Sequence, residues 1–202
     1  MPQLKESTSS FKPVPAGAHA ARCYGMVSIG TQIPTNPTYQ PSFQVVLMFE
    51  IPAETIERDG KQVPLSICRF LGTSLGKPTK PTKTNQLLSS WRGKPFTIDE
   101  AKGFDLAKVV GHPCLLNIIH EDKNGQTRES IASISPLPKG MAIPPQINKS
   151  IIYEIEHGQN DVFKALPEWL QNKIKACAEW QTPAEPPVAA PSIPAGQDDV
   201  PF

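Results

Sequence analysis

The sequence predicts a mainly β domain, followed by a helical extension and a proline-rich tail. Three observations support this fold class. Apolar and polar residues alternate with period two in several stretches between residues 17 and 135, as in strands with one buried face. Asp-Gly and Asn-Gly pairs, which favour tight hairpin turns, each separate two such stretches. Many of the 23 prolines fall in connecting segments and in the tail, where they oppose helix formation.

Five strands are expected, over about 17–31, 43–51, 62–71, 114–120 and 127–135. In the first strand the alternation predicts one apolar face, made by Ala21, Cys23, Gly25, Val27 and Ile29. The opposite face would then carry Arg22, Tyr24, Met26 and Ser28. Asp59-Gly60 and Asn124-Gly125 are the predicted turns.

Two short helices are expected between the third and fourth strands. Thr84 is a candidate cap for a helix that carries Trp91, and Asp105 for a second helix that ends before Gly111. Three strands, a helical insertion and two strands match the five-stranded OB-fold barrel. A β-sandwich or another small barrel would give the same order of elements.

The chain divides into four parts. A polar lead covers 1–15, the OB-fold domain 16–140, a C-terminal extension 141–180 and a tail 181–202. The extension contains an amphipathic helix, expected over Asp161–Trp180, with an apolar stripe made by Phe163, Leu166, Leu170, Ile174 and Cys177. Pro167 suits the first turn of that helix.

The expected helix can use its apolar stripe in two ways. Packing on the barrel is the plainer interpretation, and a contact in a homo-oligomer is the alternative, because apolar character extends toward Trp180. Six prolines among the last 22 residues predict a disordered, extended linker without a packed core.

Charge is divided unevenly along the chain. The formal net charge is +1, but the tail holds Glu185, Asp198 and Asp199 and no Lys or Arg. Residues 1–180 therefore carry 20 basic and 16 acidic side chains, a net +4. A basic body with an acidic end suggests a polyanion-binding domain whose tail stays available for another contact.

Little in the sequence indicates catalysis, a metal or a cofactor. The four cysteines are far apart without a CxxC pair, the four histidines are scattered, and no nucleophile motif is present. Residues 72–79 resemble a phosphate-binding loop, but only three residues separate the two glycines and Pro78 replaces the magnesium ligand. ATP binding is therefore not expected, although this segment can still grip DNA phosphates.

The beginning of the chain and its hydropathy bear on localisation. Met1–Ser10 is polar, unlike a signal peptide, and no apolar run reaches membrane-spanning length. A cytoplasmic, reduced protein that does not engage a membrane is expected.

Residues 61–98 carry seven Lys or Arg and no Asp or Glu, with Phe70, Trp91 and Phe96 between them. Binding of unpaired bases needs cations along the phosphates and aromatic faces for stacking. The predicted DNA-binding residues are Arg22, Tyr24, Lys61, Arg69, Phe70, Lys77, Lys80, Lys83, Trp91, Arg92 and Lys94, with Tyr39 a weaker candidate. The same pattern also fits Trp91 and Phe96 in the core and the lysines on a solvated rim.

The strongest motif is Asp198-Asp199-Val200-Pro201-Phe202. It resembles the acidic tip of bacterial single-stranded DNA-binding proteins, although Gln197 stands where another acidic residue is usual. An aromatic ring beside carboxylates suits an apolar pocket rimmed by Arg or Lys on a partner protein. A solubilising end without a partner is the alternative.

The whole layout looks like that of bacteriophage single-stranded DNA-binding proteins, with an OB domain, a linker and this tip. The resemblance implies sequence-tolerant binding of single-stranded DNA during replication or recombination in a bacterial host cell, with replication or repair proteins recruited by the tip. The protein would then be no enzyme. Two alternatives stay open: a protein–protein adaptor that mimics the tip, and a metal-dependent DNA-processing enzyme.

Overall fold

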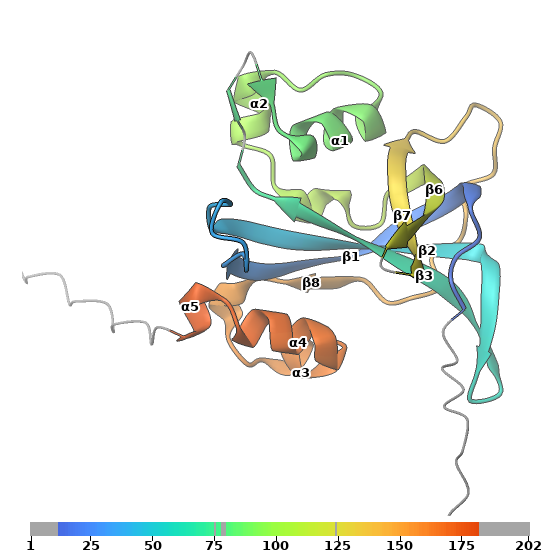
Figure 1. The fold of residues 1–202 in the computed structure, drawn as a ribbon. Coiled ribbons are helices and arrows are strands. Elements are labelled where there is room, and N and C mark those ends of the chain that lie inside the picture. The colour runs from blue at the N-terminus through green and yellow to red at the C-terminus, as the bar shows by residue number, and fades with distance from the viewer. Residues whose placement is uncertain (1–11, 75, 78–79, 124, 182–202) are drawn as a thin grey trace, which may run out of the picture.

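The computed structural model describes residues 12–74, 76–77, 80–123 and 125–181, which form a mainly β fold (Figure 1). Five long strands form an antiparallel sheet in the order β3-β2-β1-β6-β7, and β8 pairs in parallel with β1. Their bounds are Gly17–Gln32 (β1), Ser42–Arg58 (β2), Lys61–Gly72 (β3), Pro113–Lys123 (β6), Gln126–Ser135 (β7) and Ile151–Tyr153 (β8). A small ladder joins β4 (Gly76–Lys77) to β5 (Lys80–Pro81).

Two groups of helices flank the sheet, one on each side (Figure 1). The first group, between β5 and β6, contains α1 (Lys83–Arg92), α2 (Ile98–Lys102) and the 3-10 helix η1 (Leu106–Val109). The second group follows β8 and contains the 3-10 helix η2 (Ile155–His157), α3 (Asp161–Ala165), α4 (Glu168–Lys175) and α5 (Ala178–Gln181).

The sheet curls into half a barrel. Its two ends approach each other where the Arg69 guanidinium on β3 donates a hydrogen bond of 3.2 Å to the Ile131 carbonyl on β7. The predicted mainly β class and the helical insertion between the third and fourth long strands are confirmed.

Both predicted hairpin turns lie where the sequence places them. Asp59 and Gly60 have φ angles of 50° and 72°, the left-handed conformation that a two-residue hairpin turn requires, and Arg58 pairs with Lys61. Lys123 likewise pairs with Gln126 across Gly125, whose φ is 74°; Asn124 lies outside the described residues.

The sheet buries apolar side chains on both faces. On β2, Val45, Leu47 and Phe49 belong to the cluster enclosed by the curled sheet, α1 and η1. Val46 and Met48 point the other way and pack with the second helical group. The C-terminal extension thus covers a face that would otherwise meet solvent, and the plainer interpretation of its apolar stripe is confirmed.

The predicted faces of β1 are confirmed as far as Tyr24 and wrong for Met26, Val27 and Ile29. The register of β1 against β2 shifts between Cys23 and Gly25 and again between Ser28 and Gly30. Such bulges change which side of the sheet the following residues face. Cys23 and Met26 therefore share the enclosed cluster, whereas Val27 and Ile29 join Tyr24 on the face that packs with the second helical group.

The helix expected over Asp161–Trp180 is three short helices. Leu166, immediately before Pro167, has the extended backbone (φ −66°, ψ 150°) that a following proline enforces, so α3 ends there. Pro167 then stands at the N-cap of α4, close to its expected first-turn position. The apolar stripe survives the breaks because its five side chains are all buried.

The cap of α1 is Thr82, not the predicted Thr84. The Thr82 hydroxyl accepts a hydrogen bond of 3.3 Å from the Asn85 amide, while Thr84 lies inside the first turn and donates to the Gly72 carbonyl. The second prediction is confirmed: Asp105 caps η1 through the Ala107 amide, and Gly111 follows with a positive φ.

Candidate nucleic-acid interface

Two exposed aromatic rings meet at the boundary between β3 and α4. The ring centroids of Phe70 and Trp169 are 6.2 Å apart, and the side chains remain 43% and 42% exposed. The Lys173 ammonium lies 5.5 Å from the Phe70 centroid, within the range of a cation–π contact. We call Phe70, Trp169 and Lys173 the aromatic–lysine cluster.

The alternation of β3 and the turn of α4 place this cluster. Ile67 and Leu71 point into the enclosed core, so Phe70 points outward. On α4, Leu170 and Ile174 are fully buried beneath the sheet. Trp169 and Lys173, four residues apart, therefore share the exposed face of the helix at the edge of β3.

The loops beside the cluster emerge from one end of the sheet. Gln32 pairs with Ser42 and Gln44 with Gly72, so the β1–β2 loop and the segment after β3 start side by side. The β1–β2 loop carries Tyr39, which is 68% exposed. The Gln32 side chain donates a hydrogen bond of 3.2 Å to the Lys173 carbonyl, which ties the base of this loop to α4.

A second tie joins the same loop to α5. The Glu179 carboxylate accepts hydrogen bonds from the Thr31 amide at 2.7 Å and from its hydroxyl at 2.5 Å. Burial acts to raise the pKa of Glu179, but these hydrogen bonds outweigh it and hold that pKa below its ordinary value. The Glu179 carboxylate thereby holds the base of the loop against α5.

Basic residues also lie on the segment that leads from β3 to α1. Lys77 and Lys80 are paired through their backbones in the β4–β5 ladder, and Lys80 and Lys83 are exposed. Arg69 and Lys83 line a cavity of about 220 Å³ between β3, β7 and α1. Of the predicted residues, Phe70 belongs to the aromatic–lysine cluster, whereas Arg69 and Lys83 meet on the opposite face of β3. Lys80 lies between Phe70 and Lys83 along the chain, on the segment that leads from β3 to α1.

Two predicted aromatic residues are buried. Trp91 is 8% exposed, lies 5.5 Å from the Phe49 ring and donates its indole N–H to the Pro113 carbonyl at 2.9 Å. Tyr24 is 7% exposed, and burial raises its pKa to about 12. Neither ring offers a face to a base in this structure.

Other predicted cations lie elsewhere. Lys61 follows the β2–β3 turn, at the end of β3 remote from Gly72, and Arg22 is half-buried opposite Glu50 on β2. Lys94 is exposed in the connection between α1 and α2. These residues do not adjoin the aromatic–lysine cluster along the sheet.

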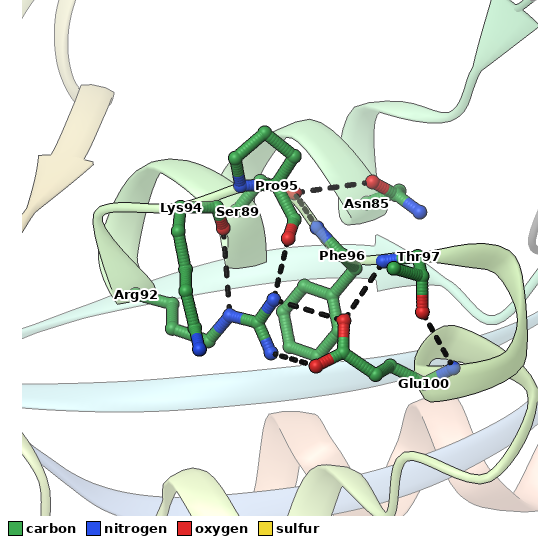
Figure 2. A network of polar contacts seen from close by, with 8 residues as sticks. All are labelled: Asn85, Ser89, Arg92, Lys94, Pro95, Phe96, Thr97 and Glu100. Carbon is green, nitrogen blue, oxygen red and sulfur yellow. Dashed lines mark hydrogen bonds and ion pairs between the residues drawn. The ribbon is translucent and has the colours of Figure 1, made fainter.

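The Arg92 guanidinium is held by contacts with residues that follow it in the chain (Figure 2). Its guanidinium lies 3.8 Å from the Phe96 ring centroid, donates to the carbonyl of Pro95 and forms an ion pair of 3.1 Å with Glu100. Hydrogen bonding from Arg92 lowers the pKa of Glu100 to about 2. Arg92 therefore fixes the loop between α1 and α2.

The sequence does not single out Trp169 or Lys173 as DNA-binding residues. Their four-residue spacing predicts one helix face, but nothing local shows that this face borders Phe70, about a hundred residues away. The tip residues Asp198, Asp199, Val200, Pro201 and Phe202 lie outside the described residues.

The described part of the chain contains no group of three or more His, Cys, Asp or Glu that could hold a metal ion. Its helices are all too short or too polar to cross a membrane. No family model matches the sequence, and no curated protein is detectably similar to it.

Proposed function

We propose that this chain binds single-stranded DNA with little sequence preference, on the aromatic–lysine cluster and the basic segment next to it. The observation that carries the proposal is the exposed pair Phe70 and Trp169 with a lysine over one ring. Any base can stack on such a pair, and each stacked base contributes about 1–3 kcal/mol. Lys80 and Lys83 would accompany the phosphates beyond the cluster.

The proposal includes the OB type of barrel. The strand order β3-β2-β1-β6-β7, the contact between β3 and β7 and the helix between β3 and β6 all agree with that topology. In OB barrels the second and third strands and the loop between the first two commonly meet nucleic acid. Phe70 and Tyr39 occupy those positions here.

Tip residues 198–202 would recruit replication or repair proteins. This part of the proposal rests on the motif and on its charge, opposite to that of the body. Phe202 supplies an aromatic anchor, and the two aspartates would steer the segment toward a basic partner surface.

Fluorescence anisotropy with a labelled oligo-dT strand and its duplex tests DNA binding. Phe70→Ala should lower the affinity for the single strand about fivefold or more without changing its salt dependence, because it removes a stacking face. Lys173→Gln should reduce the slope of log K against log salt concentration by about 0.7, the value for one phosphate contact.

The matched controls are Ile119→Ala, an exposed apolar residue on β6, and Lys102→Gln, an exposed lysine on α2. Neither should affect binding. Absence of single-strand binding by the unaltered chain at low salt would overturn the proposal. An equal loss of affinity in Ile119→Ala and Phe70→Ala would show that the aromatic–lysine cluster is not part of the binding site.

A further inference from the structure

An apolar groove lies on the side of the sheet that carries the first helical group. It has a volume of about 530 Å³, between α1, η1, the start of β6 and residues 136–143. Leu88 and Trp91 belong to its floor and are backed by the enclosed core. Met141 and Ile143 form an exposed lip, at 44% and 62% exposure.

The charged and titratable side chains that line this groove are Arg92, Lys108 and His112, with no Asp or Glu among them. Arg92 already pairs with Glu100, whereas Lys108 and His112 are exposed. An apolar floor beside cationic side chains selects an apolar segment that carries negative charge.

A second cavity of the molecule has the opposite electrostatic character. The cavity of about 400 Å³ between the curled sheet and α2 is lined by Asp105, Glu154 and Glu156 against a single cation, Lys102. An acidic ligand would be repelled there. The difference in sign singles out the larger groove for an acidic, apolar occupant.

We infer that the groove binds residues 197–202 of this same chain. The ring of Phe202 enters the apolar floor, and Asp198 and Asp199 lie beside Lys108 and His112. Residues 181–202 carry three acidic side chains and no basic one, which complements the charged residues that line the groove.

The chain is long enough for this contact. Residues 182–202 span up to about 70 Å when extended, whereas a folded body of this size is only about 40 Å across. The segment can therefore pass from α5 around the sheet to the groove, although α5 and α1 lie on opposite sides of it (Figure 1).

Docking in the groove would hide the tip from partner proteins while leaving the aromatic–lysine cluster uncovered on the other side of the sheet. A partner would compete with the groove for the tip. The inference stands whether or not the chain binds DNA, since no contact in it involves a nucleic acid.

The methionines offer a direct test with the full chain. Four are present, and Met141 lies in the groove while Met26 and Met48 are buried on either face of the sheet. In methyl NMR spectra of methionine-labelled protein, Phe202→Ala should shift the Met141 signal, because the ring leaves its neighbourhood. The Met26 and Met48 signals should not move.

A charge variant provides the second arm. Lys108→Glu should abolish the effect of Phe202→Ala on Met141, whereas Lys102→Glu, an exposed control outside this groove, should preserve it. An unchanged Met141 signal in Phe202→Ala would overturn the inference. A shift at Met48 instead would place the tip on the other face of the sheet and would also overturn it. A Met141 shift that fades on dilution would do the same, because it would place the tip on a second copy of the chain.

Discussion

Trp91 and Trp169 differ in how deeply they are buried. Trp91 fills the enclosed core and satisfies the Pro113 carbonyl, whereas Trp169 leaves almost half of its surface to solvent. Both belong to helices that pack on the sheet, so amphipathic pattern alone does not distinguish them. Trp91 points into the core that α1 covers, whereas Trp169 lies beside the buried face of α4 and borders solvent.

A matched pair of substitutions tests this division. Trp91→Leu should lower the free energy of unfolding by about 2–4 kcal/mol, through a cavity and an unsatisfied carbonyl. Affinity for single-stranded DNA should persist as long as the protein is folded. Trp169→Leu should change stability by less than about 1 kcal/mol, but weaken DNA binding at least fivefold.

Urea unfolding and anisotropy titration measure the two quantities on the same samples. The opposite pattern, in which folded Trp91→Leu loses affinity and Trp169→Leu keeps it, would transfer the stacking role to Trp91.

At the scale of elements, the connection from α1 to α2 is fixed by charge. Arg92 closes α1 and contacts Pro95, Phe96 and Glu100, and the Thr97–Glu100 capping box starts α2 (Figure 2). This connection holds Phe96 and Arg92 in the wall of the apolar groove.

The depressed pKa of Glu100 makes this connection sensitive to acid. A carboxyl whose pKa falls from 4.5 to about 2 on folding stabilises the folded state fully above its unfolded value. That contribution disappears as the pH falls from about 4.5 toward 2. The gap in urea midpoint between the unaltered protein and Glu100→Gln should therefore be widest near pH 6 and shrink by pH 2.5.

Arg92→Gln should reproduce the same loss, because it removes the partner that lowers the pKa. A gap that stays constant between pH 6 and pH 2.5 would show that the ion pair does not act on stability.

At the scale of the molecule, sequence patterns predict correctly those features that depend on a few neighbouring residues. Period-two alternation and the turns at Asp59-Gly60 and Gly125 predict the strands, and Pro167 predicts where a C-terminal helix begins. Each of these signals acts over a few residues.

What could not be predicted depends on long-range packing. The bulge of β1 between Cys23 and Gly25 turns Met26 into the enclosed core and Val27 toward the second helical group, and that group covers the outer face of β2. The meeting of Phe70 with Trp169 joins residues about a hundred positions apart. Two of the three residues of the aromatic–lysine cluster, Trp169 and Lys173, therefore lie outside the basic stretch that the sequence singles out.

The second helical group, which forms the C-terminal layer of the molecule, packs on the sheet at Gly30. Its φ is +68°, and an added Cβ would lie 2.6 Å from Cys177 Sγ and 2.7 Å from Ile155 Cδ1. Gly30→Ala therefore combines backbone strain with a clash against two buried side chains. We expect it to lower the free energy of unfolding by about 2–5 kcal/mol.

Gly60→Ala is the matched control, because its φ is +72° and nothing lies within 4 Å of the added Cβ. It carries the backbone strain alone, about 1–2 kcal/mol. Only Gly30→Ala should speed amide hydrogen exchange in α4 relative to β6 and β7, since the clash loosens one layer against the sheet. It should also weaken DNA binding, because α4 carries Trp169 and Lys173. Equal exchange profiles in the two variants would mean that the C-terminal layer does not depend on this contact.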